Sequence, residues 1–231
     1  MVAARAEFLG AGHYLPLANA LTELSQGHAA GARLVTEAGA GTGYYIARVL
    51  DDLPESLGLA IDLSKYAARR AAKAHDRLNA AVADIWEGLP LKDQCIDLAL
   101  NIFAPRPAHE LFRTLRRDGK LIVAIPAYRH MAELRDSLGL LEVDPKKEQR
   151  VARALDPFFT HLERRFCRWD MELNHRQILN LAGMGPSTRH IDPSTLAVRI
   201  AMLPSTVPVT GAVDVHVYAR SGNLRLSAAV G

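Results

Sequence analysis

The stretch Glu37-Ala-Gly-Ala-Gly-Thr-Gly43 decides the fold of this 231-residue chain. It follows the apolar pair Leu34-Val35 and precedes residues 44–50, which are typical of a helix. Glycine adopts positive φ angles at little steric cost, and a helix that begins after such a loop presents free N–H groups at its positive end. An acidic residue at the end of a strand, followed by three alternating glycines, therefore predicts a backbone loop wrapped around a small polar ligand.

The glycine spacing indicates which ligand this loop holds. The spacing is G-x-G-x-G, whereas dinucleotide-binding folds have G-x-G-x-x-G. The pattern therefore favours S-adenosylmethionine (SAM) over NAD. The rival interpretation, an NAD-dependent dehydrogenase, also needs a catalytic Tyr-x-x-x-Lys or an equivalent, and the sequence offers neither. Taken alone, the loop could also be an ordinary turn before a helix.

Strands and helices alternate along the first half of the chain. Short apolar runs predict strands, and alanine- or charge-rich segments between them predict helices, one of them capped by Ser64. This alternation predicts an α/β fold with a doubly wound, Rossmann-like parallel sheet. The expected strands cover 33–36, 57–61, 78–83, 95–102 and 121–125, the expected helices cover 65–74 and 109–116, and a turn is expected at 118–119.

Two further regions flank this alternation. Residues 1–30 are expected to form a helical lead-in, and residues 142–182 a helical insertion that meets the substrate. Two late strands, near 197–203 and 213–219, predict an antiparallel hairpin at one edge of the sheet. Because no repeat or linker interrupts the chain, we expect one domain, residues 1–231.

Polar residues follow successive strands, and ligands of doubly wound sheets lie at the carboxyl ends of strands. Asp62 can accept hydrogen bonds from both ribose hydroxyls of SAM; its alternative is an acid that stabilises a helix N-terminus. Asp84 can accept from the adenine amino group while Ile85 packs on the ring; its alternative is a turn aspartate. Together with the glycine loop, this order of residues predicts a SAM-dependent methyltransferase.

The segment Asn101-Ile-Phe-Ala-Pro105 follows the fourth strand, where the methyl acceptor should lie. Phe103 could stack on a planar acceptor, since base–aromatic stacking contributes about 1–3 kcal/mol per base, and Pro105 would stiffen the loop. The alternative is an aromatic side chain packed in the core beside a loop proline.

Composition adds weaker constraints. A net charge of +3 is compatible with an acidic partner such as RNA, without requiring one. Cys95 and Cys167 lack the spacing of a structural zinc site, so no bound metal is expected. The chain has no signal-like start and no apolar run of about 18 residues, which predicts a cytoplasmic protein without a membrane partner.

Several blocks in fixed order resemble one family, the bacterial 23S rRNA (guanine-N1)-methyltransferases, one branch of which confers resistance to tylosin-type macrolides. The resemblance runs from residue 4 to about 140 and is weaker beyond. It rests on Phe8-Leu9-x-x-Gly12-His13-Tyr14-x-Pro16-Leu17, Gly41-x-Gly43-Tyr44-Tyr45, Gly58-Leu-x-x-Asp62-x-Ser64-Lys65, Ala71-Ala-Lys73, Leu89-Pro90, Phe103-Ala104-Pro105 and Arg129-His130-x-x-Glu133-Leu134.

The chain departs from the family's pattern in three places. The family's N-terminal zinc-binding module, which helps to engage the RNA hairpin, is missing, so the chain is either trimmed or a shortened relative. The glycine motif begins with Glu37 rather than aspartate, and Asp118-Gly119 stands where the family has Pro-Gly-Gly.

The resemblance implies SAM as cofactor and a 23S rRNA hairpin as partner, and it implies roles for individual residues. A homodimer is also expected. The implied acceptor and catalytic residues are Asn101, Phe103, Pro105, His130 and Glu133, and the implied SAM-binding residues are His13, Tyr14, Glu37, Gly39, Gly41, Gly43, Asp62, Leu63, Asp84, Ile85 and Asn101. His13 and His130 could equally be structural histidines.

Guanine N1 carries a proton that must leave on methylation, and His130, Glu133 or Asp84 could accept it. Basic residues between 146 and 168, together with Arg106, could hold phosphates; the alternative is a solvated charged face, since acidic residues are interspersed. Two other functions stay open: a methyltransferase for small natural products, and a SAM-binding module without catalysis.

Overall fold

The computed structural model describes residues 1–140, 142, 144–184 and 191–222, and its contacts divide the chain into two compact units. Unit 1 comprises Met1–Leu17, Pro126–Pro145 and Phe166–Asp214, and unit 2 comprises Ala18–Ile125, Lys146–Arg165 and Val215–Gly231. The glycine loop and the predicted acidic strand ends all belong to unit 2.

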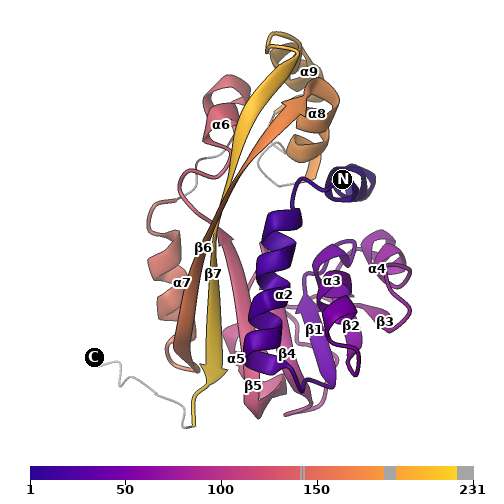
Figure 1. The fold of residues 1–231 in the computed structure, drawn as a ribbon, viewed down its shortest axis with the longest axis vertical. Coiled ribbons are helices and arrows are strands. Elements are labelled where there is room, and N and C mark those ends of the chain that lie inside the picture. Colours follow the sequence, from indigo (N-terminus) through magenta and orange to yellow (C-terminus); the bar gives the residue numbers. More distant parts are fainter. Residues whose placement is uncertain (141, 143, 185–190, 223–231) are drawn as a thin grey trace. The chain divides into compact units, whose positions relative to one another are not determined.

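Within the described residues, seven strands form one sheet in the order β3-β2-β1-β4-β5-β7-β6 (Figure 1). The neighbours from β3 to β5 pair in parallel. This confirms the predicted α/β fold with a doubly wound, Rossmann-like sheet. The strands are β1 (Leu34–Ala38), β2 (Leu57–Asp62), β3 (Leu78–Val82), β4 (Ile96–Ile102), β5 (Leu115–Pro126), β6 (Phe159–Asn174) and β7 (Thr206–Arg220).

Strands β6 and β7 run antiparallel. The hydroxyls of Thr160 and Ser221 lie 3.2 Å apart, and farther along β6 the ring of Trp169 lies against Gly211 of β7. Residues later in β6 therefore lie opposite residues with lower sequence numbers in or next to β7. The two arrows accordingly point in opposite directions in Figure 1. The predicted antiparallel pair exists.

One member of that pair was assigned to the wrong segment. Residues 197–203, expected as a strand, fall largely in helix α9 (Pro193–Ala201), whereas residues 159–174, within the segment 142–182 expected as helical, form strand β6. Helix α7 (Lys147–Leu155) ends before β6 begins. Along β6, Trp169, Met171 and Leu173 are buried and alternate with exposed residues, so apolar side chains recur with the period of two that a strand requires.

The helical lead-in is confirmed as two helices. Gly12, at φ +83°, lies between α1 and α2 in the left-handed region that glycine tolerates. Ser64 caps α4 as predicted, with its hydroxyl accepting from the Ala67 N–H at 3.4 Å. The helices are α1 (Val2–Gly10), α2 (Leu15–Ala29), α3 (Tyr44–Asp52), α4 (Lys65–Ala71), α5 (Ala108–Thr114), α6 (Ala132–Leu138), α7, α8 (His175–Met184) and α9.

The turn expected at Asp118-Gly119 is instead an irregularity within β5. Ile96 of β4 pairs with Leu115, yet Leu98 pairs with Lys120, so β5 carries extra residues between the two pairings. The extra residues make β5 bulge locally, as in a β-bulge.

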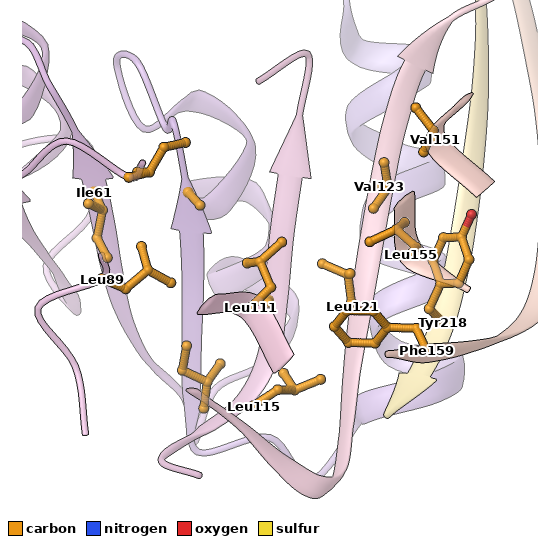
Figure 2. Close-up of a cluster of buried hydrophobic side chains, with 14 of the residues drawn as sticks. Ile61, Leu89, Leu111, Leu115, Leu121, Val123, Val151, Leu155, Phe159 and Tyr218 are labelled. Atoms are coloured by element: carbon orange, nitrogen blue, oxygen red, sulfur yellow. The ribbon is translucent and has the colours of Figure 1, made fainter. Parts of the chain in front are cut away.

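A hydrophobic cluster in unit 2 fixes the sheet against its covering helices. Leu111 of α5, Leu121 of β5 and Leu155 of α7 are almost completely buried and converge with Phe159 and Tyr218 (Figure 2). Burying a side chain of this size stabilises a fold by about 1.5–3 kcal/mol. The cluster therefore gives the ends of β1, β2 and β4 a rigid support. Within the part of the chain that the structure describes, no helix is both long and apolar enough to span a membrane.

Candidate functional site

The loop between β1 and α3 can be built only with glycine at its turning points. Gly39, Gly41 and Gly43 have φ angles of +77°, +56° and +76°. A Cβ at Gly39 would lie 2.5 Å from the Cβ of Ala104, closer than two carbons can approach. The loop backbone thus packs directly against the segment after β4, and any side chain at Gly39 would separate the two.

The side chain of Glu37 links the start of the glycine loop to helix α3. Its side chain is 1% exposed, and one carboxylate oxygen accepts from the backbone N–H of Ile46 at 3.1 Å, in the first turn of α3. A carboxylate at this point satisfies a free helix N–H and stabilises the positive end of the helix. The position fits a residue that shapes the cofactor loop, and direct contact with SAM stays a prediction.

Asp62, at the end of β2, joins the loop to the next helix. One carboxylate oxygen accepts from the Gly41 N–H and the other from the Ser64 N–H, both at 2.8 Å. An ionised carboxylate has about four lone-pair sites, so both oxygens retain capacity for ribose hydroxyls. The two interpretations of Asp62 given above are therefore compatible. Leu63, the next residue, is largely exposed.

The segment after β3 is a compact turn. One carboxylate oxygen of Asp84 accepts from the Trp86 N–H at 2.9 Å, which is the turn geometry of its alternative interpretation. Ile85 is buried in the hydrophobic cluster, while Trp86 is 65% exposed. The burial of Ile85 leaves little of its side chain for an adenine ring, and the exposed Trp86 was given no role from the sequence.

Asn101 brings an unusual polar group to the end of β4. Its side chain is fully buried, and its Nδ2 donates to the carbonyls of Pro105 at 2.7 Å and Ala38 at 3.4 Å. Its Oδ1 is buried and accepts from no described protein group. An unsatisfied buried acceptor costs about 1–3 kcal/mol, so the site favours a ligand that brings an N–H or ammonium donor to this oxygen.

Phe103 is held in a strained conformation near the same strand end. Its φ is +54°, in the left-handed region that costs a bulky residue about 1–3 kcal/mol. Its N–H donates to the Ala124 carbonyl at 3.1 Å, and its ring, 39% exposed, lies 6.5 Å from that of Tyr45. The geometry suits an aromatic presented to a planar partner. Pro105 is exposed on the same loop.

These observations test whether the residues fit SAM. The glycine loop leaves no room for a side chain at Gly39 or Gly43. Asp62 offers acceptors for hydroxyl groups, and the buried Oδ1 of Asn101 can accept from a ligand. Hydroxyl groups and an ammonium group are what SAM would bring, so the donor and acceptor set fits it. Tyr45, whose ring contacts Phe103, was noted in the sequence only as part of a motif; its place beside the glycine loop was the available signal.

The remaining predicted residues belong to unit 1. Tyr14 is buried, its hydroxyl lies 3.2 Å from Nε2 of His130, and its ring meets Trp169 edge-on at 5.2 Å. Nδ1 of His130 accepts from the Ala212 N–H at 3.1 Å. The Nε2 proton therefore points to Tyr14 when the ring is neutral. With both nitrogens engaged, His130 is placed to hold structure together rather than to accept a substrate proton.

Glu133 is also engaged. Its two carboxylate oxygens accept from the N–H and the hydroxyl of Thr210, at 3.0 and 2.7 Å. Partial burial raises the pKa of Glu133, but the hydrogen bonds from Thr210 and the charge of Arg129 outweigh that effect and lower it overall. A carboxylate with a lowered pKa is a weaker base, so its predicted role as proton acceptor gains no support.

His13 is held by fewer hydrogen bonds than His130 and Glu133. Its ring stacks on Phe8 at 4.9 Å, burial lowers its pKa, and its buried Nε2 lacks a hydrogen-bond partner among the described residues. The neutral ring therefore retains a nitrogen for a ligand or water. Its predicted role toward the cofactor stays open.

Two arginines of the charged segment 146–168 form ion pairs within unit 2. Arg164 binds Glu148 at 3.0 Å, and Arg165 binds Glu23 at 2.8 Å. These ion pairs favour a solvated charged face over a row of basic side chains that bind RNA phosphates. Arg106 differs, because burial lowers its pKa and its Nε is buried without a described partner. No cluster of three or more His, Cys, Asp or Glu suited to a metal occurs among the residues described.

Two curated relatives are similar over most of the chain. The 23S rRNA (guanine(748)-N1)-methyltransferase of Streptomyces fradiae is 46% identical over 91% of this chain and 76% of its own length. A protein of Micromonospora griseorubida named as a 23S rRNA (guanine-N1)-methyltransferase is 45% identical over 94% of this chain and 79% of its own length. No family model matches the chain.

A solved structure supports the fold. The SAM-dependent methyltransferase from Thiobacillus denitrificans, in complex with S-adenosyl-L-homocysteine, aligns with a TM-score of 0.51 over 87% of this chain and 90% of its own, at 14% identity. At that identity the similarity concerns the fold alone.

Proposed function

This chain belongs to the family of bacterial 23S rRNA (guanine-N1)-methyltransferases, and we propose that it transfers the methyl group of SAM to N1 of a guanine in 23S rRNA. The observation that carries the proposal is the 45–46% identity to two such enzymes over more than nine-tenths of the chain. The site in unit 2 supports it, because its residues fit SAM.

SAM supplies an electrophilic methyl group on sulfur. The chain's part is to bind and orient: Asp62 would accept from the ribose, the glycine loop would surround the methionine end, and Asn101 Oδ1 would accept an N–H or ammonium donor. Phe103 would stack on the guanine. Such positioning can supply about 7–11 kcal/mol of a barrier.

The N1 proton of guanine needs an acceptor as the new N–C bond forms. His130 has both nitrogens engaged, Glu133 has a lowered pKa, and Asp84 accepts the Trp86 N–H within its turn. We therefore infer that positioning of the base, with release of the proton to water, matters more than a strong protein base. The guanine must be turned out of its stack to expose N1.

The direct test uses SAM with a labelled methyl group and a 23S rRNA hairpin. We expect label in the RNA and a primer-extension stop at one guanine, because N1 methylation blocks base pairing. A hairpin with that guanine replaced by adenine is the control and should take up no label. Label found only on a small molecule would favour the natural-product methyltransferase, and SAM binding without any turnover would favour the non-catalytic module.

The proposal also covers the location of the enzyme, its biological role, its domain organisation and its oligomeric state. A ribosomal substrate places the enzyme in the cytoplasm. The resemblance to enzymes of tylosin resistance supports a protective role against such macrolides, measurable as a raised inhibitory concentration in a sensitive host. We propose a single catalytic domain and a homodimer, and light scattering in solution tests the dimer.

A further inference from the structure

Tyr128 and Arg129 occupy the two corner positions of a β-turn directly after β5. The N–H of His130 donates to the carbonyl of Ala127 at 2.9 Å and closes the turn. Both corner residues are exposed, and the Tyr128 side chain is 57% exposed. An aromatic ring that stays exposed gains little hydrophobic stabilisation from folding and keeps its surface available to a ligand.

This turn is fixed at both ends to β7, within unit 1. Before the turn, the Ala127 N–H donates to the carbonyl of Ala212 at 2.9 Å; after it, the Met131 N–H donates to the carbonyl of Thr210 at 2.8 Å. The Ala212 N–H in turn donates to the His130 ring at 3.1 Å. These bonds hold the turn in one conformation.

Backbone strain beside the turn is a further sign of a ligand site. Met131 has φ +55° and begins α6 from the left-handed region. Glu133 bonds Thr210 and fixes the first turn of that helix. A conformation that costs about 1–3 kcal/mol persists only where its surroundings impose it, and such residues cluster at ligand sites.

Two arginines that follow Tyr128 in the sequence bring positive charge near its ring. The guanidinium carbon of Arg135 lies 5.1 Å from the centre of the ring, and Arg129 is its neighbour in the turn. A cation over one face of a tyrosine orders the ring and adds to its stacking surface. An exposed aromatic with cations beside it is the arrangement on which unpaired RNA bases stack while phosphates meet arginine.

We propose that Tyr128, flanked by Arg129 and Arg135, is a stacking platform for an unpaired base of the RNA substrate. This inference rests on the proposed function for its ligand, an RNA hairpin with unpaired loop nucleotides. Tyr128 contributes the π surface, and Arg129 contributes a contact to phosphate. A rigid turn suits the role, because little conformational entropy is lost when the base stacks.

The test measures binding of a fluorescein-labelled 23S rRNA hairpin by anisotropy at fixed salt. Tyr128→Ala should weaken binding about fivefold to a hundredfold, the loss of one base–aromatic stack, whereas Tyr128→Phe should bind within about twofold of the parent because the ring remains. Arg129→Gln should reduce the slope of log affinity against log salt by about 0.7–0.9, the value for one phosphate contact.

Matched controls make the test specific. Tyr66 in unit 2 is 64% exposed and has Lys65 5.4 Å from its ring centre, so Tyr66→Ala removes an equally exposed, cation-flanked tyrosine. It should leave RNA affinity unchanged. A fully paired RNA of the same length should bind the parent and Tyr128→Ala equally, and both proteins should bind SAM equally by calorimetry.

The outcomes separate the two proposals. Equal hairpin affinity of the parent and Tyr128→Ala, or an equal loss in Tyr66→Ala, overturns the platform and leaves the methyltransferase proposal standing. A parent that binds the hairpin through Tyr128 but transfers no methyl group to it overturns the proposed activity and leaves the platform standing.

Discussion

At the scale of single residues, Asp62 carries two functions in one carboxylate. It holds Gly41 and Ser64 through their backbone N–H groups, and in the proposed function it also receives the ribose of SAM. A substitution therefore acts on both the loop and the ligand, and the two effects need separate measurements.

Asp62→Ala should lower SAM affinity by at least about a hundredfold, since two hydrogen bonds to a charged acceptor are lost at about 1.5–3 kcal/mol each. Isothermal calorimetry measures the affinity, and thermal unfolding without SAM shows whether the variant folds. Asp62→Asn, which keeps the size and one acceptor, should fold better than Asp62→Ala and still bind SAM weakly. Asp52→Ala, an exposed acid at the end of α3, is the control. Unchanged SAM affinity in both Asp62 variants would remove the ribose assignment.

Residue types also explain which site predictions had structural support. Asp62 and the glycines are recognisable because φ angle and hydrogen-bonding capacity are local properties of the residue. His130 and Glu133 could not be judged in this way. Their availability as bases depends on Tyr14, Ala212 and Thr210, which lie far away in sequence.

At the scale of elements, helix α5 is joined to the loop before β4 by one charged network. Glu110 accepts from the Leu89 N–H at 2.8 Å and from Arg113, while Arg113 also donates to the carbonyls of Leu89 and Leu91 and to Asp93. The hydrogen bond from Arg113 lowers the pKa of Glu110 to about 2.

This lowered pKa predicts a pH-dependent contribution to stability. Because the folded-state pKa lies below the unfolded value of about 4.3, the contribution is complete above about pH 5 and is lost as pH falls toward 2. The difference in unfolding free energy between the parent and Glu110→Gln should thus shrink steadily over that window. Urea unfolding at several pH values measures it. Glu55→Gln, exposed between α3 and β2, should show no such trend, and a pH-independent difference for Glu110→Gln would contradict the network.

Elements also show where sequence patterns fail. The arginines of residues 164–168 suggested a helix, yet they lie in β6, whose buried residues alternate from Trp169 onward. Strand formation there depends on pairing with β7, and the ring of Trp169 fits only because Gly211 has no side chain. Strand preference depends on such neighbours far more than helix preference does.

At the scale of the whole molecule, the two units are built from shared elements. The chain passes between units within α2, β5, β6 and β7, as well as between Pro145 and Lys146. Independent domains usually meet at exposed linkers, whereas here a continuous helix and three continuous strands serve both. This continuity supports the proposal of a single domain.

A single domain should unfold in one transition. The chain has two tryptophans, and Trp86→Phe leaves Trp169 of unit 1 as the only one. In this variant the fluorescence transition should coincide with the far-UV circular dichroism transition, which reports the whole chain. SAM at about a hundred times its dissociation constant should stabilise the fold by about 2.7 kcal/mol and shift both transitions together. Separate midpoints, or a SAM-induced shift in only one signal, would indicate two independent domains.

The sequence by itself determined the α/β class, the positions of the parallel strands along the chain, the glycine loop and the acidic residues at the strand ends. These follow from local geometry: alternation of apolar runs, backbone freedom at glycine and carboxylates placed directly after strands. Only the tertiary structure decided that 159–174 is a strand, that Asn101 keeps a buried unsatisfied acceptor, that His130 is tied to Tyr14 and that Tyr128 stands exposed on a fixed turn. Each of these depends on groups that folding brings together from distant positions, and no pattern within a short window of sequence contains that information.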